Sequence, residues 1–458
     1  MLDTLLTIGI FLLGLSVLIV IHELGHYWAA RIFGIKVEEF ALFWGKKLVG
    51  FKRGDTEWRI NAIPIGGYVK ISGMLDESFD EDQVAGDPEP WEFRSKPTWQ
   101  RLIVMLGGII MNIILGIILF IGLKYTYGDK KIVNDTLPNG IYVAEGSPAY
   151  DLGFRTGDVI TSYRGEPIKY FTDAADPNLL VDRGKYFDIQ RSGAAVRIDI
   201  PDDYMNDYLD YPPAKRGMSL FSPDMSAIVL IPDTATNSAR AKNELPPVNI
   251  NAWKAGLRDR DQIVAVDSVP IKWWSDLHSH FQDKPEQSFE ISVLRNGQPM
   301  NFTVKTDTGS TIGVLQHTDT LYSTIKYSFG EAIPVGTAAA WEEGIVRTIK
   351  GLGMVFSGNA DPRKSLQGPV KIAKIYGRGF RVGGWKVFWG LTAMLSMVLA
   401  VMNLLPIPVL DGGQILILSI EAIIGREIPQ GPKMWILRIS FYLVIGLMLL
   451  IVLNDIIN

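Results

Sequence analysis

Four long apolar runs divide the chain. They cover Leu5–Ile21, Leu102–Leu123, Val387–Leu410 and Met434–Leu453. Only the last run contains a charged residue, Arg438, near its start. A helix needs roughly 20 apolar residues to cross the hydrocarbon core of a bilayer, and the first run reaches that length only if its helix continues through His22 and Glu23. The pattern predicts an α-helical polytopic membrane protein with four transmembrane helices.

Basic residues near the ends of these runs predict the orientation of the chain. Lys and Arg are frequent between residues 31 and 101, and again between the third and fourth runs. Since short loops rich in Lys and Arg remain in the cytoplasm, both termini and the region from 124 to 386 are expected on the opposite side of the membrane.

The predicted cytoplasmic loop begins with a strand-forming pattern. Four short strands are expected at Val37–Phe43, Lys47–Lys52, Glu57–Asn61 and Tyr68–Ser72. Gly45, Gly54 and the Gly66-Gly67 pair supply turns between them. The sequence therefore predicts a small membrane-associated β-sheet. Its edge would bind an extended substrate, or the sheet would be a simple capping hairpin. The acidic residues 76–97 are predicted to form a mobile loop.

An internal repeat lies between the second and third runs. Ala149, Gly153, Phe154, Arg155, Asp158, Ile160, Pro167 and Ile168 return 103 residues later as Ala252, Gly256, Leu257, Arg258, Asp261, Ile263, Pro270 and Ile271. Self-similarity at a fixed offset indicates two copies of one structural unit. The first copy resembles the PDZ domains of bacterial envelope proteases, so two periplasmic PDZ-like α+β domains are expected. They would bind peptides by strand addition or act as packed spacers.

These patterns predict eight consecutive segments. They are a first transmembrane helix (1–33), the cytoplasmic loop with β-hairpins (34–97), a second transmembrane helix (98–127), two PDZ-like domains (128–218 and 219–308), an amphipathic helical region (309–384), a third transmembrane segment (385–424) and a fourth (425–458). The helical region 309–384 would lie on the membrane surface or brace the outer domains.

Composition narrows the chemistry. The net charge of −4 gives no sign of a nucleic-acid-binding surface. The chain has no cysteine, which excludes disulfides and thiolate zinc sites. Any zinc site must therefore use nitrogen and oxygen ligands.

The motif His22-Glu23-Leu24-Gly25-His26 directly follows the first uncharged run. Residues four apart share one face of a helix, so the two imidazoles can bind one metal ion while Glu23 acts as general base on water. Ionisable residues inside a membrane helix are costly and indicate function. The alternative is a helix that leaves the membrane at His22.

Asp411 is the candidate for a third ligand. The third run is expected to cross inward, which brings Asp411 to the same side as His22. Pro406 and Pro408 interrupt the helical hydrogen bonds before it, and irregular backbone at membrane depth is tolerated where it lines water or is buried in protein. The alternative is that Asp411 caps an interfacial helix. The other histidines lie in the predicted outer region, at His278, His280 and His317.

The pairing of HExxH in the first run with Asn403…Pro406…Pro408…Asp411-Gly412 in the third resembles the site-2 protease family of intramembrane zinc metalloproteases. The resemblance covers essentially the whole chain. It implies that His22, His26 and Asp411 bind Zn²⁺ and that Glu23 is the catalytic acid and base. It also implies that Asn403 and the segment Gly66-Gly67-Tyr68 contact the substrate. By ligand type alone, two histidines and one aspartate also suit iron or cobalt.

One position departs from the family pattern. The second run contains Gly107-Gly108-Ile109, with Ile109 where the family often has proline. The polar residue that follows, Asn112, is explained equally well by hydrogen bonding between packed helices, and no catalytic role is assigned to it.

The resemblance implies a protease of the bacterial inner membrane. Its substrate would be the transmembrane segment of a single-pass membrane protein, of anti-sigma-factor type after a first periplasmic cut, or a remnant signal peptide. Such cleavage would belong to regulated intramembrane proteolysis in an envelope stress response. Two other functions fit parts of the pattern: a membrane sensor that binds peptides through its PDZ-like pair, and a transporter with broken helices, although four spans show no inverted repeat.

Overall fold

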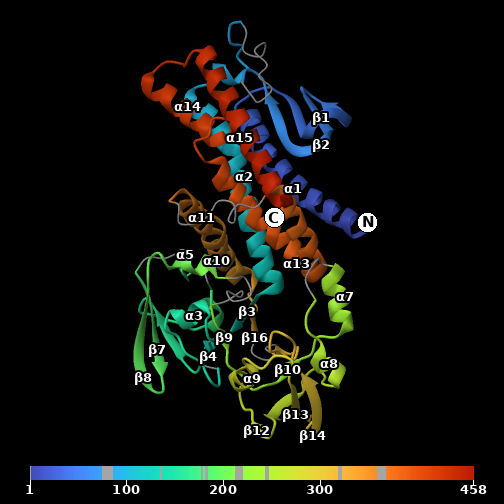
Figure 1. The fold of residues 1–458 in the computed structure, drawn as a ribbon. Coiled ribbons are helices and arrows are strands. Elements are labelled where there is room, and N and C mark those ends of the chain that lie inside the picture. Colours follow the sequence, from blue (N-terminus) through green and yellow to red (C-terminus); the bar gives the residue numbers. More distant parts are fainter. Residues whose placement is uncertain are drawn as a thin grey trace. The chain divides into compact units, whose positions relative to one another are not determined.

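The structure is a computed structural model that describes residues 2–74, 86–134, 137–176, 179–180, 184–211, 220–242, 247–317, 322–357 and 368–457 (Figure 1). Residues 75–85 lie outside the described residues, so the predicted acidic loop 76–97 is described only from residue 86 onward. The chain forms two compact units, one made of Met1–Gly128 and Lys326–Asn458, the other of Asp129–Ile325.

Among its described residues, the first unit contains four helices that are long and apolar enough to cross a membrane. They are α1 (Leu2–Ile32), α2 (Thr98–Tyr127), α13 (Pro369–Asn403) and α15 (Gln430–Ile457). Helix α1 continues through His22 and Glu23, so the first apolar run does have the length of a transmembrane helix. A 3-10 turn, η2 (Phe93–Ser95), precedes α2.

Helices α1 and α2 meet at two glycines. A Cβ atom added to Gly25 would lie 2.1 Å from the main-chain oxygen of Gly107, and one added to Gly107 would lie 2.5 Å from the oxygen of Gly25. Only residues without side chains allow membrane helices to approach this closely. This crossing fixes the face of α1 that carries His22 and His26 against α2.

The third apolar run is not one continuous helix. Just before this run, Gly384 has a positive φ of 56° and kinks α13. Helix α13 ends at Asn403, and α14 (Asp411–Ile424) begins after an irregular segment that contains the two prolines. The expected break in the helix before Asp411 is therefore present. Helix α14 turns back and contacts α2 (Figure 1).

The helices after the second unit begin only at Phe329. They are α10 (Phe329–Ala339), a π-helical turn (Ala340–Val346) and α11 (Arg347–Phe356). Gly336 of α10 lies against the backbone of Ile121, where an added Cβ would be 2.6 Å from its Cα. An added Cβ at Gly344 would be 2.6 Å from Met397 of α13. These segments pack on the membrane helices α2 and α13.

The predicted four-strand pattern of the loop forms one antiparallel sheet built from two long bent strands, β1 (Val37–Arg53) and β2 (Thr56–Ile71). Phe40 pairs with Val69 on one side and with Trp58 on the other, and Trp58 also pairs with Phe51. The spatial order of the four segments is thus 67–71, 37–42, 56–61 and 47–53. The segment 67–71 forms one edge of this sheet among the described strands.

The second unit contains two four-stranded antiparallel sheets with equivalent strand order, β6-β5-β7-β8 and β12-β11-β13-β14. The first consists of β5 (Val159–Tyr163), β6 (Glu166–Pro167), β7 (Lys185–Arg191) and β8 (Ala194–Ile200). The second consists of β11 (Gln262–Val266), β12 (Val269–Pro270), β13 (Ser288–Arg295) and β14 (Gln298–Lys305). Matching topology explains the repeat in the sequence.

Short elements complete both halves of this unit. Its described segments include the helices α3 (Pro148–Asp151), α4 (Phe171–Ala174), α5 (Tyr204–Asp210), α7 (Thr234–Lys242), α8 (Asn251–Ala255) and α9 (Trp274–Phe281). Three strand pairs join distant segments: β3 (Asp129–Ile132) with β16 (Tyr322–Ile325), β4 (Ile141–Tyr142) with β9 (Ser222–Pro223), and β10 (Val229–Leu230) with β15 (Leu315–Gln316). Each half has its own apolar core.

The repeated aspartate has the same structural task in both halves. Asp158 is fully buried, accepts the main-chain N–H of Arg155 at 2.8 Å, and pairs with Arg191 at 2.7 Å. Asp261 makes the equivalent contacts with Arg258 and Arg295. The sequence repeat therefore preserves a buried charged network as well as a strand pattern.

We expect Asp158→Ala to destabilise the first half of this unit by about 3 kcal/mol, because Arg191 and the Arg155 N–H lose a buried partner. Hydrogen exchange of the intact protein should show faster exchange in β5, β7 and β8 and unchanged exchange in β11, β13 and β14. Asp199→Ala, at an exposed position on β8, is the control and should change neither set. Equal protection in Asp158→Ala and the parent protein would contradict this role.

Candidate metal centre

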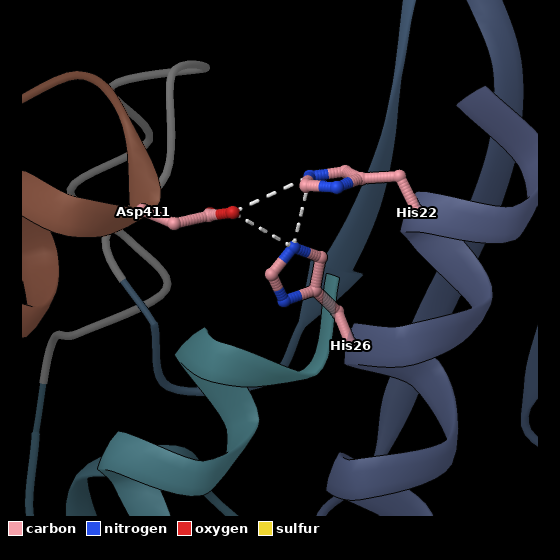
Figure 2. Close-up of side chains that lie close together, drawn as sticks. All are labelled: His22, His26 and Asp411. Atoms are coloured by element: carbon pink, nitrogen blue, oxygen red, sulfur yellow. Dashed lines mark hydrogen bonds and ion pairs between the residues drawn. The ribbon is translucent and has the colours of Figure 1, made fainter. Parts of the chain in front are cut away.

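Three predicted side chains converge in the first unit. Figure 2 shows His22 and His26 on successive turns of α1, with Asp411 facing them from the first turn of α14. The two Nε2 atoms are 3.3 Å apart, and Oδ2 of Asp411 lies 3.4 Å from Nε2 of His22 and 3.5 Å from Nε2 of His26. These three residues form a group able to hold a metal ion.

The dimensions of this triangle fit zinc. Zinc binds imidazole nitrogen and carboxylate oxygen at about 2.0–2.1 Å in tetrahedral geometry, which places neighbouring ligand atoms about 3.3–3.4 Å apart. Among the described residues, Oδ2 of Asp411 is buried without a hydrogen-bond partner. A buried carboxylate oxygen of this kind is costly unless a cation or a hydrogen-bond donor satisfies it. The unpartnered oxygen and the spacing of the three ligand atoms therefore both fit a zinc ion.

Helix α2 holds both imidazole rings. The Nδ1 atom of His26 lies 2.9 Å from the main-chain oxygen of Val104, to which it donates. The Nδ1 atom of His22 lies 3.2 Å from Nδ2 of Asn112. Between these contacts, a Cβ atom added to Gly108 would be 2.4 Å from His26 and 2.5 Å from His22. Gly108 therefore leaves the space that the rings occupy.

The segment before α14 places Asp411. A Cβ atom added to Gly412 would lie 2.3 Å from the main-chain oxygen of Leu404, and one added to Gly413 would lie 2.2 Å from the oxygen of Ile407. The irregular segment can therefore fold back on the first turn of α14. The N-terminal end of a helix also favours a carboxylate electrostatically.

A cleft opens beside the three residues, and Glu23 and the sheet edge line it. Glu23 is 9% exposed. The full lining is His22, Glu23, His26, Gly67, Tyr68, Val69, Ile71, Met74, Met105, Val409, Leu410, Asp411, Gln414 and Leu437. The edge segment 67–71 of the sheet is thus brought next to the candidate metal centre.

The remaining predicted residues are placed differently. Nδ2 of Asn403 lies 3.4 Å from Nε2 of His22, so Asn403 reaches the site. Gly67 and Tyr68 line the cleft, whereas Gly66 does not and instead lies next to the indole of Trp44.

Sequence reasoning missed Val104 and Gly108, and assigned no role to Asn112. The contact of Val104 is made by its main-chain oxygen, which carries no sequence signal. Gly108 was visible only as part of a small-residue pair in an apolar run. Since the helix that approaches α2 was unknown, that pair could not be connected to the histidines.

Comparison with known proteins defines the class. The profile of peptidase family M50 matches residues 10–447. The chain therefore belongs to peptidase family M50, the site-2 proteases. It is an integral membrane zinc metalloprotease, and zinc is its cofactor.

Named relatives cover nearly the full length. The chain is 29% identical to the regulator of sigma-E protease RseP of Escherichia coli (strain K12), over 99% of both chains. It is 28% identical to the regulator of sigma E protease of Haemophilus influenzae, over 98% of both chains. A Neisseria meningitidis protein whose name contains the words zinc metalloprotease is also 28% identical over 98% of both chains.

We expect Gly108→Ala to abolish tight zinc binding, because the added methyl group would overlap both imidazole rings. Gly122→Ala is the matched control on the same helix, since a Cβ atom there meets nothing within 4 Å. Zinc content of the purified proteins, measured by atomic emission after dialysis, should fall strongly in the first variant only. Full zinc content in Gly108→Ala would contradict the proposed packing of the rings.

Proposed function

We propose that this protein is an intramembrane zinc endopeptidase that cleaves transmembrane segments of single-pass membrane proteins. The observation that carries the proposal is the triangle of His22, His26 and Asp411 inside a bundle of membrane-length helices, beside a carboxylate and a sheet edge. Hydrolysis of a peptide bond by a metal site requires water, a proton acceptor and an extended substrate in one place.

His22, His26 and Asp411 are the proposed zinc ligands. With three protein ligands, a tetrahedral site keeps one position free, which is typical of catalytic zinc. Bound zinc supplies a Lewis acid that makes water nucleophilic at neutral pH. The spacing of the three donor atoms and the orphaned oxygen of Asp411 support this assignment.

Glu23 is the proposed general base and acid. It lies between the two histidines in sequence and lines the same cleft. Its carboxylate would take a proton from the attacking water and later donate it to the leaving amine. Burial beside the cleft limits competing contacts with bulk solvent.

The sheet edge is the proposed substrate-binding element. A peptide bond in a helix is shielded by its own hydrogen bonds, so a transmembrane substrate must unwind before its carbonyl can react. An extended strand can then pair with a free sheet edge through main-chain hydrogen bonds. The segment that includes Gly67 and Tyr68 lies at the cleft, while Gly66 would act by shaping the bend and Asn403 by contacting substrate or orienting His22.

The cellular setting is proposed from charge and from the relatives. The Lys- and Arg-rich loop supports a site near the cytoplasmic face of a bacterial inner membrane, with both termini and the second unit in the periplasm. Two of the relatives are named as regulators of sigma-E, which supports an anti-sigma factor, trimmed first outside the membrane, as substrate. The second unit would contain the two PDZ-like domains.

We expect Glu23→Gln to retain zinc and to slow cleavage of a reporter transmembrane helix at least about 100-fold, because the amide cannot accept a proton from water. Glu57→Gln, which exchanges a carboxylate of the sheet that does not line the cleft for an amide, is the control. Initial rates in detergent micelles, with zinc content measured on the same samples, give the comparison. Parental cleavage by Glu23→Gln would remove Glu23 from its proposed role.

A further inference from the structure

The two histidines differ in the group that contacts Nδ1, the ring nitrogen that points away from Asp411. Nδ1 of His26 faces a carbonyl oxygen, and a carbonyl can only accept a hydrogen bond. His26 therefore carries its proton on Nδ1 and turns the lone pair of Nε2 toward Asp411. Nδ1 of His22 faces the side-chain amide of Asn112, which can present either a donor or an acceptor.

Asn112 is a buried polar residue that helix packing does not explain. It is 0% exposed, and its Oδ1 has no hydrogen-bond partner among the described residues. Its main-chain oxygen accepts a hydrogen bond from Oγ of Ser396 at 2.7 Å. The polar contact between α2 and α13 at this level therefore uses the backbone of Asn112, and the side chain points at His22.

The orientation of this amide selects the tautomer of His22. With Nδ2 toward the ring, Nδ1 accepts and the proton of His22 lies on Nε2. With Oδ1 toward the ring, after a turn of 180° about the last side-chain bond, Nδ1 carries the proton and Nε2 has the lone pair. Only the second tautomer can bind a metal through Nε2, the atom that faces His26 and Asp411.

We propose that Asn112 is a positioning residue of the metal centre, whose Oδ1 accepts the Nδ1 proton of His22 and holds this ring in the metal-binding tautomer. The inference rests on the proposed function, because it treats His22 as a ligand. Metal-bound histidines almost always donate their second N–H to an oxygen, and losing that partner costs about 10–100-fold in metal affinity. Val104 supplies this oxygen for His26, and Asn112 supplies it for His22.

Substitutions at Asn112 distinguish the effect of its hydrogen-bond acceptor from the effect of its side-chain volume. Asn112→Leu keeps the approximate size and removes the acceptor, whereas Asn112→Asp keeps an oxygen that can only accept. Ser396→Ala is the packing control, because it removes the bond to the backbone of Asn112 and leaves the amide in place. The zinc affinity of each full-length protein is measured in detergent by competition with a chelator. The absorption spectrum of the Co²⁺-substituted protein reports the ligand geometry.

We expect Asn112→Leu to weaken zinc binding about 10–100-fold and to alter the cobalt spectrum. Asn112→Asp and Ser396→Ala should stay close to the parent in both measurements. The inference is overturned if Asn112→Leu binds zinc like the parent with an unchanged cobalt spectrum. It is equally overturned if a folded Asn112→Asp protein loses zinc. The aspartate variant therefore tests the inference even if Asn112→Leu does not fold.

His22→Ala, measured in the same series, distinguishes this inference from the proposed function. Parental zinc affinity in His22→Ala would remove His22 from the ligand set and the proposed function with it. Loss of affinity in His22→Ala together with parental affinity in Asn112→Leu would overturn only the role of Asn112.

Discussion

The backbone contact between α1 and α2 at Gly25 and Gly107 is the constraint on which the site depends. It brings one face of α1 so close to α2 that a carbonyl of Val104 can accept from one imidazole and both rings can lie next to Gly108. The histidine spacing alone would leave two flexible side chains on a helix surface. Because α2 restricts both rings, their Nε2 atoms point to the same place.

A second constraint is the interruption of the third apolar run. A continuous helix from Val387 onward would satisfy its own main-chain groups and would offer no acid at the site. The break after Asn403 instead starts a new helix at Asp411, and the glycines that follow allow the broken segment to pack closely. Irregular backbone is costly in lipid, so a polar cleft lined by protein gives this break a physical reason.

Much of this arrangement could be predicted from the sequence because the signals are local. Residues four apart must share a helix face, so the pair His22 and His26 was visible without a structure. Asp411 stood out as an acid that follows two prolines in an apolar run. The strand pattern of the loop predicted four sheet segments, and the repeat predicted equivalent positions for Asp158 and Asp261.

The features that could not be predicted depend on which helices and strands pack against each other. The order of the four sheet segments follows from how two long strands bend, which alternation does not encode. The helices from Phe329 to Phe356 pack on α2 and α13 through glycines whose partners could not be known in advance. Asn112 had an ordinary packing explanation until the structure placed its amide at His22 and its backbone at Ser396.

The central claim is that α1 and α14 jointly hold one zinc ion, and X-ray absorption at the zinc edge of the purified protein tests it most directly. The account predicts a shell of four light ligands that includes two imidazoles, and a loss of zinc or a changed shell in Asp411→Ala. A shell without imidazole, or an identical shell and zinc content in Asp411→Ala, would contradict it.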